Sequence, residues 1–208
     1  MYVALYESCN YAIGMVEVQN PATPVSKIRV RPNVDFSFIG KAVFDMQLNF
    51  KYLDKAAADK VLPVLFDILY SNMNEITPSG KSRDEEFNDW LSEVSPAIQK
   101  APRQIVLMLD DDEIIGYFQY YTRGTLLMME EIQIEKEFQG GGVFGEFYRW
   151  LVCELPDSLE TVEAFASIRN VKSRAILAHL GLIEVEAISD EILHFRGEYN
   201  NIKERYTK

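Results

Sequence analysis

The segment whose residue types best fit a chemical role is the glycine-rich run Gln139-Gly140-Gly141-Gly142-Val143-Phe144-Gly145. It follows a strand-like apolar run and precedes an apolar run at helical spacing, so we expect a strand–turn–helix unit. Glycines let a backbone approach a ligand closely with its N–H groups exposed. The first helical turn adds unpaired N–H donors and the positive end of the helix dipole. The segment therefore predicts a site for a pyrophosphate or another anion.

Two common phosphate loops do not fit this segment. No Gly-Lys-Ser/Thr follows the glycines, as a Walker loop requires, and the glycine spacing differs from that of a dinucleotide-binding turn. Taken alone, the run is also compatible with a flexible surface turn. The role of the glycine-rich run therefore has to be inferred from the elements around it and from motifs that follow it in the sequence.

Hydrophobic periodicity predicts the elements that would position this loop. The expected order is strand, helix, helix, three strands, helix, strand, helix and two strands. Asp54 is expected to cap the first helix, and Ser82 with Glu85 forms a capping-box pattern before the second, which we expect to end before Pro96. We expect a β-rich extension of short strands and turns at 1–44 and one domain at 45–208. The expected strands are 45–53, 104–109, 114–122, 126–134, 161–168, 183–188 and 192–196, and the expected helices run from 54 to 70, 82 to 94, 143 to 155 and 171 to 180.

A second motif lies after the expected strand 161–168, where Asn170 and Ser173 precede Leu180-Gly181-Leu182. Together the two motifs resemble the GNAT acetyltransferase superfamily, which has a Gln/Arg-x-x-Gly-x-Gly/Ala loop followed by a strand–Asn–helix–Gly-Phe segment. The resemblance covers the second half of the chain by motif, and positions from about 46 onward by element order. It implies an α/β (α+β) fold whose mixed, mostly antiparallel central sheet is flanked by helices. Its parallel strands would splay at a cofactor cleft.

The resemblance also implies acetyl-CoA as the acyl donor. The pantetheine arm would lie between strands 126–134 and 161–168 and bind the backbone of Ile132, Gln133 and Ile134. The pyrophosphate would bind the backbone N–H groups of Gln139, Gly140, Gly141, Gly142, Val143, Phe144 and Gly145. Asn170 would contact the pantetheine or orient the thioester, and Ser173 belongs to the same set.

The reaction of the family is attack of an amine on the acetyl thioester, which requires a base. Glu131 and Glu130 lie on the strand beside the expected thioester position. Because consecutive strand residues face opposite sides, we expect only one of them to point into the cleft. A carboxylate partly buried there would have a raised pKa. The alternative is that both are ordinary charges at the sheet surface.

The chain departs from the family pattern at two positions. Phe144 replaces a Gly or Ala, so we expect its ring to point away from the phosphates. Leu177 stands where many members have a tyrosine that protonates the departing thiolate, and Tyr120, Tyr121 and Tyr148 are the possible substitutes. Two alternatives to acetyl transfer stay open: a longer or aminoacyl donor on the same fold, and a non-catalytic module that binds coenzyme A or a partner.

Composition and charge limit the classes of partner that this protein could bind. The 208 residues carry a net charge of −11, which argues against nucleic acid. Cys9 and Cys153 form no metal spacing and no disulfide framework, and Asp110-Asp111-Asp112-Glu113 reads as a hairpin tip, so no metal is expected. Without a long apolar run, neither a membrane span nor a signal peptide is predicted. We expect a cytoplasmic protein, a small-molecule or protein amine as substrate, and a possible homodimer. The extension at 1–44 would either cover the sheet edge or pair with another chain.

Overall fold

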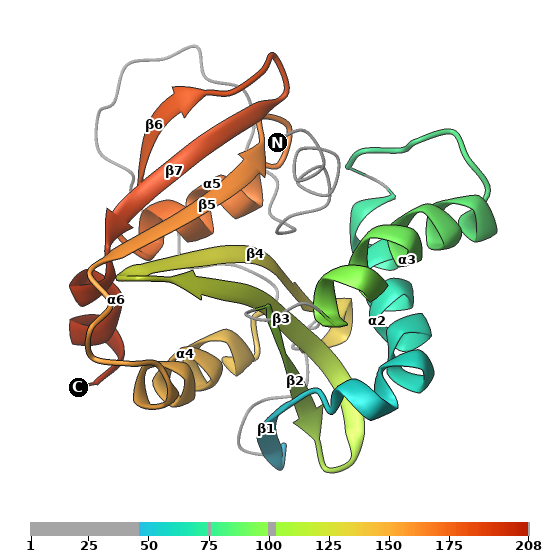
Figure 1. Ribbon diagram of the computed structural model, residues 1–208, viewed down its shortest axis with the longest axis horizontal. Helices are drawn as coiled ribbons and strands as arrows, with labels where there is room; N and C mark the ends of the chain where they lie inside the picture. Colours follow the sequence, from blue (N-terminus) through green and yellow to red (C-terminus); the bar gives the residue numbers. More distant parts are fainter. Residues whose placement is uncertain (1–45, 75, 100–102, 208) are drawn as a thin grey trace, which may run out of the picture.

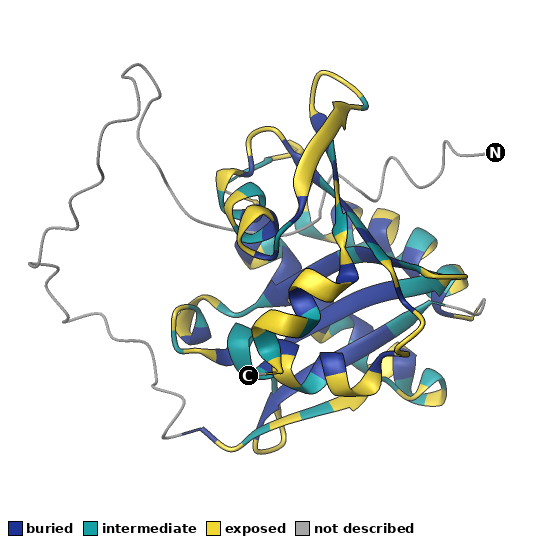
Figure 2. Ribbon diagram, turned by 90° about the vertical axis from the view of Figure 1, so that its left-hand side faces the viewer, coloured by how far each residue is buried: buried dark blue, intermediate teal, exposed yellow. Residues whose placement is uncertain are grey.

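The structure is a computed structural model that describes residues 46–74, 76–99 and 103–207. The expected extension at 1–44 lies outside these residues, so its β-rich character and the boundary at residue 45 stay predictions. Figure 2 shows the strands of the central sheet largely buried, while the outer sides of the surrounding helices are exposed.

The described residues form one mixed sheet of seven strands in the order β1-β2-β3-β4-β5-β7-β6 (Figure 1). Its neighbouring strands are antiparallel except for β4 and β5, which are parallel. The mixed, mostly antiparallel sheet that the sequence predicts is therefore confirmed. The strands are β1 (Leu48–Tyr52), β2 (Gln104–Asp110), β3 (Glu113–Arg123), β4 (Leu126–Ile134), β5 (Thr161–Ser167), β6 (Ile183–Ala187) and β7 (Ile192–Glu198).

Two buried clusters lie on the two faces of the sheet, because inward-facing residues alternate along each strand. The helices α2 (Ala58–Met73) and α3 (Arg83–Gln99) pack on one face against Leu107 and Tyr117. The other cluster joins residues of α4 (Val143–Glu154), α5 (Val171–His179) and α6 (Tyr199–Tyr206) to Val106 and Phe118. Each face of the sheet is thus covered by helices of its own (Figure 1).

Local capping signals define where the first two helices begin. Asp54 accepts a hydrogen bond from the Ala56 N–H at 2.9 Å at the start of a 3-10 turn, Lys55–Ala57, that leads into α2. Ser82 and Glu85 form the predicted capping box, in which the Ser82 N–H donates to Glu85 and the Glu85 N–H donates to Ser82 Oγ.

Several element boundaries differ by a few residues from the predicted ones, and one helix was not predicted. The helix α3 continues through Pro96 to Gln99, which places Ile98 in the core beside α2. Residues Tyr199–Tyr206 form α6, which the sequence did not predict. Its sequence is polar and only Tyr199 and Ile202 are buried, so hydrophobic periodicity was too weak to indicate a helix.

Candidate active site

The parallel strands β4 and β5 part in the middle of the sheet. Their pairing runs from Leu126 opposite Thr161 to Met129 opposite Ala164. Beyond that point β5 continues beside β7, and β4 continues beside β3. Figure 1 shows the two ribbons starting side by side and diverging toward the end of β4. The predicted splay is confirmed.

A β-bulge lies where the strands part. Gln119 of β3 is opposite Glu131, whereas the next residue, Tyr120, is opposite Met129. Glu130 is therefore an extra residue in β4, directly after the last residue that pairs with β5. Because a bulge bends its strand and increases its twist, this residue accounts for the divergence of β4 from β5.

The parted edge of β4 offers backbone groups to a ligand. The Glu135 N–H donates to the Ile115 carbonyl at 2.9 Å, so Glu135 faces β3. Because backbone groups alternate along a strand, those of Ile134 and Ile132 face the parted edge and those of Gln133 face β3. Two of the three predicted positions thus point toward the gap. An amide-rich ligand could pair with them as an added strand does.

The glycine-rich loop follows this edge. After a 3-10 turn, Lys136–Phe138, two loop glycines have left-handed backbones, Gly140 at φ +78° and Gly142 at φ +94°. Gly142 is the residue before α4, and at the start of a helix the first N–H groups lack the usual intrahelical acceptor. Here the Gly145 N–H donates to the Gly142 carbonyl at 2.9 Å, which leaves the N–H groups of Val143 and Phe144 as the helical donors for an anion. The ring of Phe144 packs on Tyr148 at 4.6 Å between ring centroids and lies against the core, and its orientation relative to a phosphate stays a prediction.

The side chain of Gln139 connects the loop to its surroundings. Its Nε2 donates to the Ile134 carbonyl at 2.7 Å, and its Oε1 accepts from Lys172 Nζ of α5 at 3.0 Å. The pKa of Lys172 is lowered by burial and by the nearby charge of Lys136. Two mutually repelling cations beside a loop of N–H donors favour an anion. Lys136 and Lys172 belong to no sequence motif, so the sequence alone did not indicate them.

Asn170 and Ser173 organise the start of α5. Asn170 Oδ1 accepts a hydrogen bond from the Ser173 N–H at 3.0 Å, so Asn170 is the N-cap of the helix. Both side chains are buried, and Asn170 Nδ2 contacts Met73 Sδ of α2 at 4.0 Å. In this arrangement they support the cleft wall, and a direct contact with a pantetheine stays a prediction.

The two candidate bases lie on the same face of the sheet. Tyr117 donates to Glu131 Oε1 at 2.6 Å, and Gln119 Nε2 donates to Glu130 Oε2 at 3.2 Å. Tyr117 and Gln119 are two residues apart in β3 and share a face. The expectation that only one glutamate faces this side is therefore wrong, because the extra residue in β4 shifts the alternation at the bulge.

The environments of the two glutamates differ. Glu131 is only 6% exposed, and burial raises its pKa to about 7. Hydrogen bonds from Tyr117 and Gln133 and the charge of Arg103 oppose that rise, whereas the charge of Glu130 adds to it. Glu130 forms an ion pair and two hydrogen bonds with Arg103. Glu131 is thus the carboxylate suited to accept a proton near neutral pH.

The tyrosines that could replace the missing hydroxyl at Leu177 lie at different places. Leu177 itself is fully buried. Tyr148 is buried on the α4 face, and its hydroxyl contacts Met129 Sδ at 3.5 Å, at the point where β4 leaves β5. The Tyr120 hydroxyl is 3.2 Å from that of Tyr52, and Tyr121 lies opposite Met128, before the strands part. Of the three, Tyr148 contacts the last β4 residue paired with β5.

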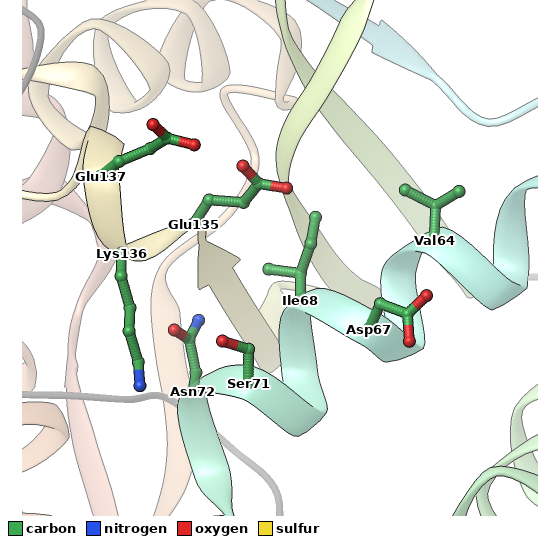
Figure 3. Close-up of a pocket in the computed structure, with 8 residues that line it drawn as sticks. All are labelled: Val64, Asp67, Ile68, Ser71, Asn72, Glu135, Lys136 and Glu137. Atoms are coloured by element: carbon green, nitrogen blue, oxygen red, sulfur yellow. The ribbon is translucent and has the colours of Figure 1, made fainter. Parts of the chain in front are cut away.

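A cavity of about 470 Å³ lies at the end of β4, between α2 and the segment that follows the strand (Figure 3). The carboxylates of Asp67, Glu135 and Glu137 line it, and Lys136 is the only cation among its lining residues. Burial raises the pKa of Glu135, and the charges of Glu137 and Glu113 add to that rise. This lining suits a cationic group better than a phosphate.

Two other kinds of feature are absent from the part of the chain that the structure describes. Its residues contain no group of three or more His, Cys, Asp or Glu side chains that could hold a metal ion. No helix among them is long and apolar enough to cross a membrane.

No protein-family model matches the sequence, and no curated protein matches it. Solved acetyltransferases, however, match the structure. An acetyltransferase from Thermus thermophilus has a TM-score of 0.55 at 15% identity, covering 73% of this chain and 96% of its own. The PaiA N-acetyltransferase of Thermoplasma acidophilum, in complex with coenzyme A, has a TM-score of 0.57 at 9% identity, covering 74% and 100%. This chain has the GNAT acetyltransferase fold.

The spermidine N-acetyltransferase of Vibrio cholerae also shares the GNAT fold. Its complex with CoA and spermine has a TM-score of 0.51 at 14% identity, covering 76% of this chain and 98% of that one. The resemblance that the two sequence motifs indicate is therefore confirmed at the level of the fold. At these identities the substrates of the neighbours do not carry over to this chain.

Proposed function

We propose that this protein is an acyl-CoA-dependent N-acetyltransferase that transfers an acetyl group from acetyl-CoA to a primary amine. The observation that carries the proposal is the position of Glu131, a buried carboxylate with a pKa of about 7. It lies next to the bulge at which β4 parts from β5. A carboxylate whose pKa lies near neutral pH, placed where β4 and β5 part, is suited to deprotonating an acceptor amine.

The cofactor would occupy the parted edge and the loop after it. The backbone groups of Ile132 and the N–H of Ile134 would pair with the pantetheine amides, as edge strands pair with an added strand. The Ile134 carbonyl already accepts from Gln139 and Asn72. The pyrophosphate would bind N–H groups between Gly140 and the first turn of α4. The positive charges of Lys172 and Lys136 would stabilise its negative charge. Coenzyme A bound to the PaiA N-acetyltransferase, which shares the fold, supports this assignment.

The reaction would proceed by direct transfer. Glu131 takes a proton from the acceptor ammonium, and the neutral nitrogen attacks the carbonyl carbon of the thioester. A C–N bond forms, the C–S bond breaks, and the thiolate of coenzyme A leaves. The nitrogen loses its second proton as the amide forms, and this proton balances the one that the thiolate takes up. The Tyr148 hydroxyl is our candidate to protonate that thiolate, because its contact with Met129 places it beside the gap.

Thiol release from acetyl-CoA in the presence of a panel of primary amines tests the proposal. We expect release in the wild type and a loss of about 10²-fold or more in Glu131→Gln, as for removal of a general base. Glu130→Gln is the matched control, and it should retain most of the activity because Glu130 is held by Arg103. Equal turnover in wild type and Glu131→Gln would refute the role of Glu131. Binding of coenzyme A without thiol release from any amine would favour a non-catalytic binding module.

A further inference from the structure

We infer that Gln119 binds the acceptor amine together with Glu131, and that this pair selects a primary amine on an unbranched carbon. The inference rests on the proposed function, because it names the acceptor class of the same site. Gln119 Oε1 would accept one N–H of the amine, and the free oxygen of Glu131 would accept another.

The orientation of the Gln119 amide follows from its neighbour. Glu130 forms an ion pair with Arg103, and both of its carboxylate oxygens accept hydrogen bonds from the Arg103 guanidinium. The group that Gln119 presents to Glu130 at 3.2 Å must therefore be Nε2, which directs Oε1 elsewhere. That oxygen is buried and has no hydrogen-bond partner among the described residues. Because an unpaired buried acceptor costs about 1–3 kcal/mol, the position favours a ligand that donates.

Glu131 supplies a second acceptor beside it. Gln119 and Glu131 are direct cross-strand partners, and residues so placed have Cβ atoms about 4.5–5.5 Å apart. Both hydrogen bonds that Glu131 receives, from Tyr117 and Gln133, end on Oε1. Its Oε2 is thus the atom left for a ligand. A primary ammonium has three N–H donors and can serve both oxygens at once.

The burial of the pair limits the shape of the ligand. Gln119 is 5% exposed and Glu131 is 6% exposed. Close packing around buried side chains leaves little room, and an N-methyl group or a branch at the adjacent carbon adds volume that a terminal –CH₂–NH₃⁺ group does not have. We therefore expect unbranched aliphatic amines or lysine-like side chains to be accepted in preference to secondary amines and branched α-amines.

The first test compares n-butylamine, N-methylbutylamine and sec-butylamine as acceptors for the wild type. We expect kcat/KM to be at least tenfold higher for n-butylamine than for either analogue. In Gln119→Met, which keeps the length of the side chain but removes its acceptor, the KM for n-butylamine should rise about tenfold. The Kd for acetyl-CoA should not change, which distinguishes amine binding from a general loss of structure. An unchanged KM, or equal kcat/KM for the three amines, would overturn the inference.

A second measurement does not depend on turnover. The side-chain amide signal of Gln119, assigned by its loss in Gln119→Met, is followed by NMR while n-butylamine is added to the protein with coenzyme A. We expect this signal to shift with n-butylamine and not with N-methylbutylamine. A shift without any thiol release would refute the proposed transfer while supporting the amine site. No shift would overturn the inference even if the protein released thiol.

Discussion

The hydroxyl of Tyr117 donates a 2.6 Å hydrogen bond to Oε1 of Glu131, and both groups are buried between the sheet and α2. The bond crosses from β3 to β4 one residue beyond the bulge. A carboxylate held on one oxygen in this way is fixed in direction, and its other oxygen is left for a proton. The same bond stabilises the charged form of Glu131 and partly offsets the effect of burial on its pKa.

Tyr117→Phe should therefore move the pH dependence of the reaction. Removing the hydroxyl removes a hydrogen bond that lowers the pKa of Glu131, so that pKa should rise above about 7. The acidic limb of the kcat/KM profile should shift to higher pH, because the base has to be deprotonated to act. The profile is measured with one amine, and Tyr121→Phe serves as the control on the same strand. An identical limb in wild type and Tyr117→Phe would show that Glu131 is not the titrating base.

Glu130→Gln should shift the same limb in the opposite direction. The charge of Glu130 raises the pKa of Glu131, so its removal should lower that pKa and extend activity to lower pH. Removing Glu130 also frees Arg103 to act on Glu131, and the charge of Arg103 lowers the pKa as well. A limb that moves to higher pH in Glu130→Gln would contradict this account of the site electrostatics.

Glu131→Gln should make the protein more stable at pH 8 than the wild type. Because the folded-state pKa of Glu131 is raised from 4.5 to about 7, the folded state binds this proton more tightly than the unfolded state. Its contribution to stability is present below pH 4.5 and is lost as pH rises through about 7. At 1.36 kcal/mol per pKa unit the loss is on the order of 3 kcal/mol. Denaturant unfolding of both proteins at pH 5 and pH 8 measures it, and a gap that does not widen with pH would contradict the prediction.

A negative charge added at Gly145 should weaken coenzyme A binding. A Cβ built on Gly145 meets no atom within 4 Å, and the residue lies in the first turn of α4, where a carboxylate stabilises a helix. Gly145→Asp should therefore fold normally but oppose the pyrophosphate, with a Kd for coenzyme A raised about tenfold, an energy of about 1.4 kcal/mol. Gly145→Asn is the neutral control of the same shape. If calorimetry gives equal affinities for the two variants, the pyrophosphate does not lie at this helix start.

Much of the fold was predictable because its signals are local. The capping box of Ser82 and Glu85, the glycine turn before α4 and the alternating apolar residues of β4 each depend on neighbours a few residues away. These features were enough to predict the sheet, the loop and the GNAT resemblance. The exception is α6. It packs on α4, and its few buried residues indicate a helix only once that tertiary contact is known.

The arrangement of the candidate site was decided by tertiary structure. The sequence alone placed Glu130 and Glu131 on opposite faces of a strand, because regular alternation is the only rule available without a partner strand. Pairing of β3 with β4 creates the bulge that brings both to one face and ends the contact with β5. The pKa of Glu131 likewise depends on burial and on Tyr117 and Arg103, which lie 14 and 28 positions away along the chain. The sequence by itself determined most of the elements and the glycine-rich loop before α4, whereas long-range pairing of β3 with β4 set the environment of each glutamate.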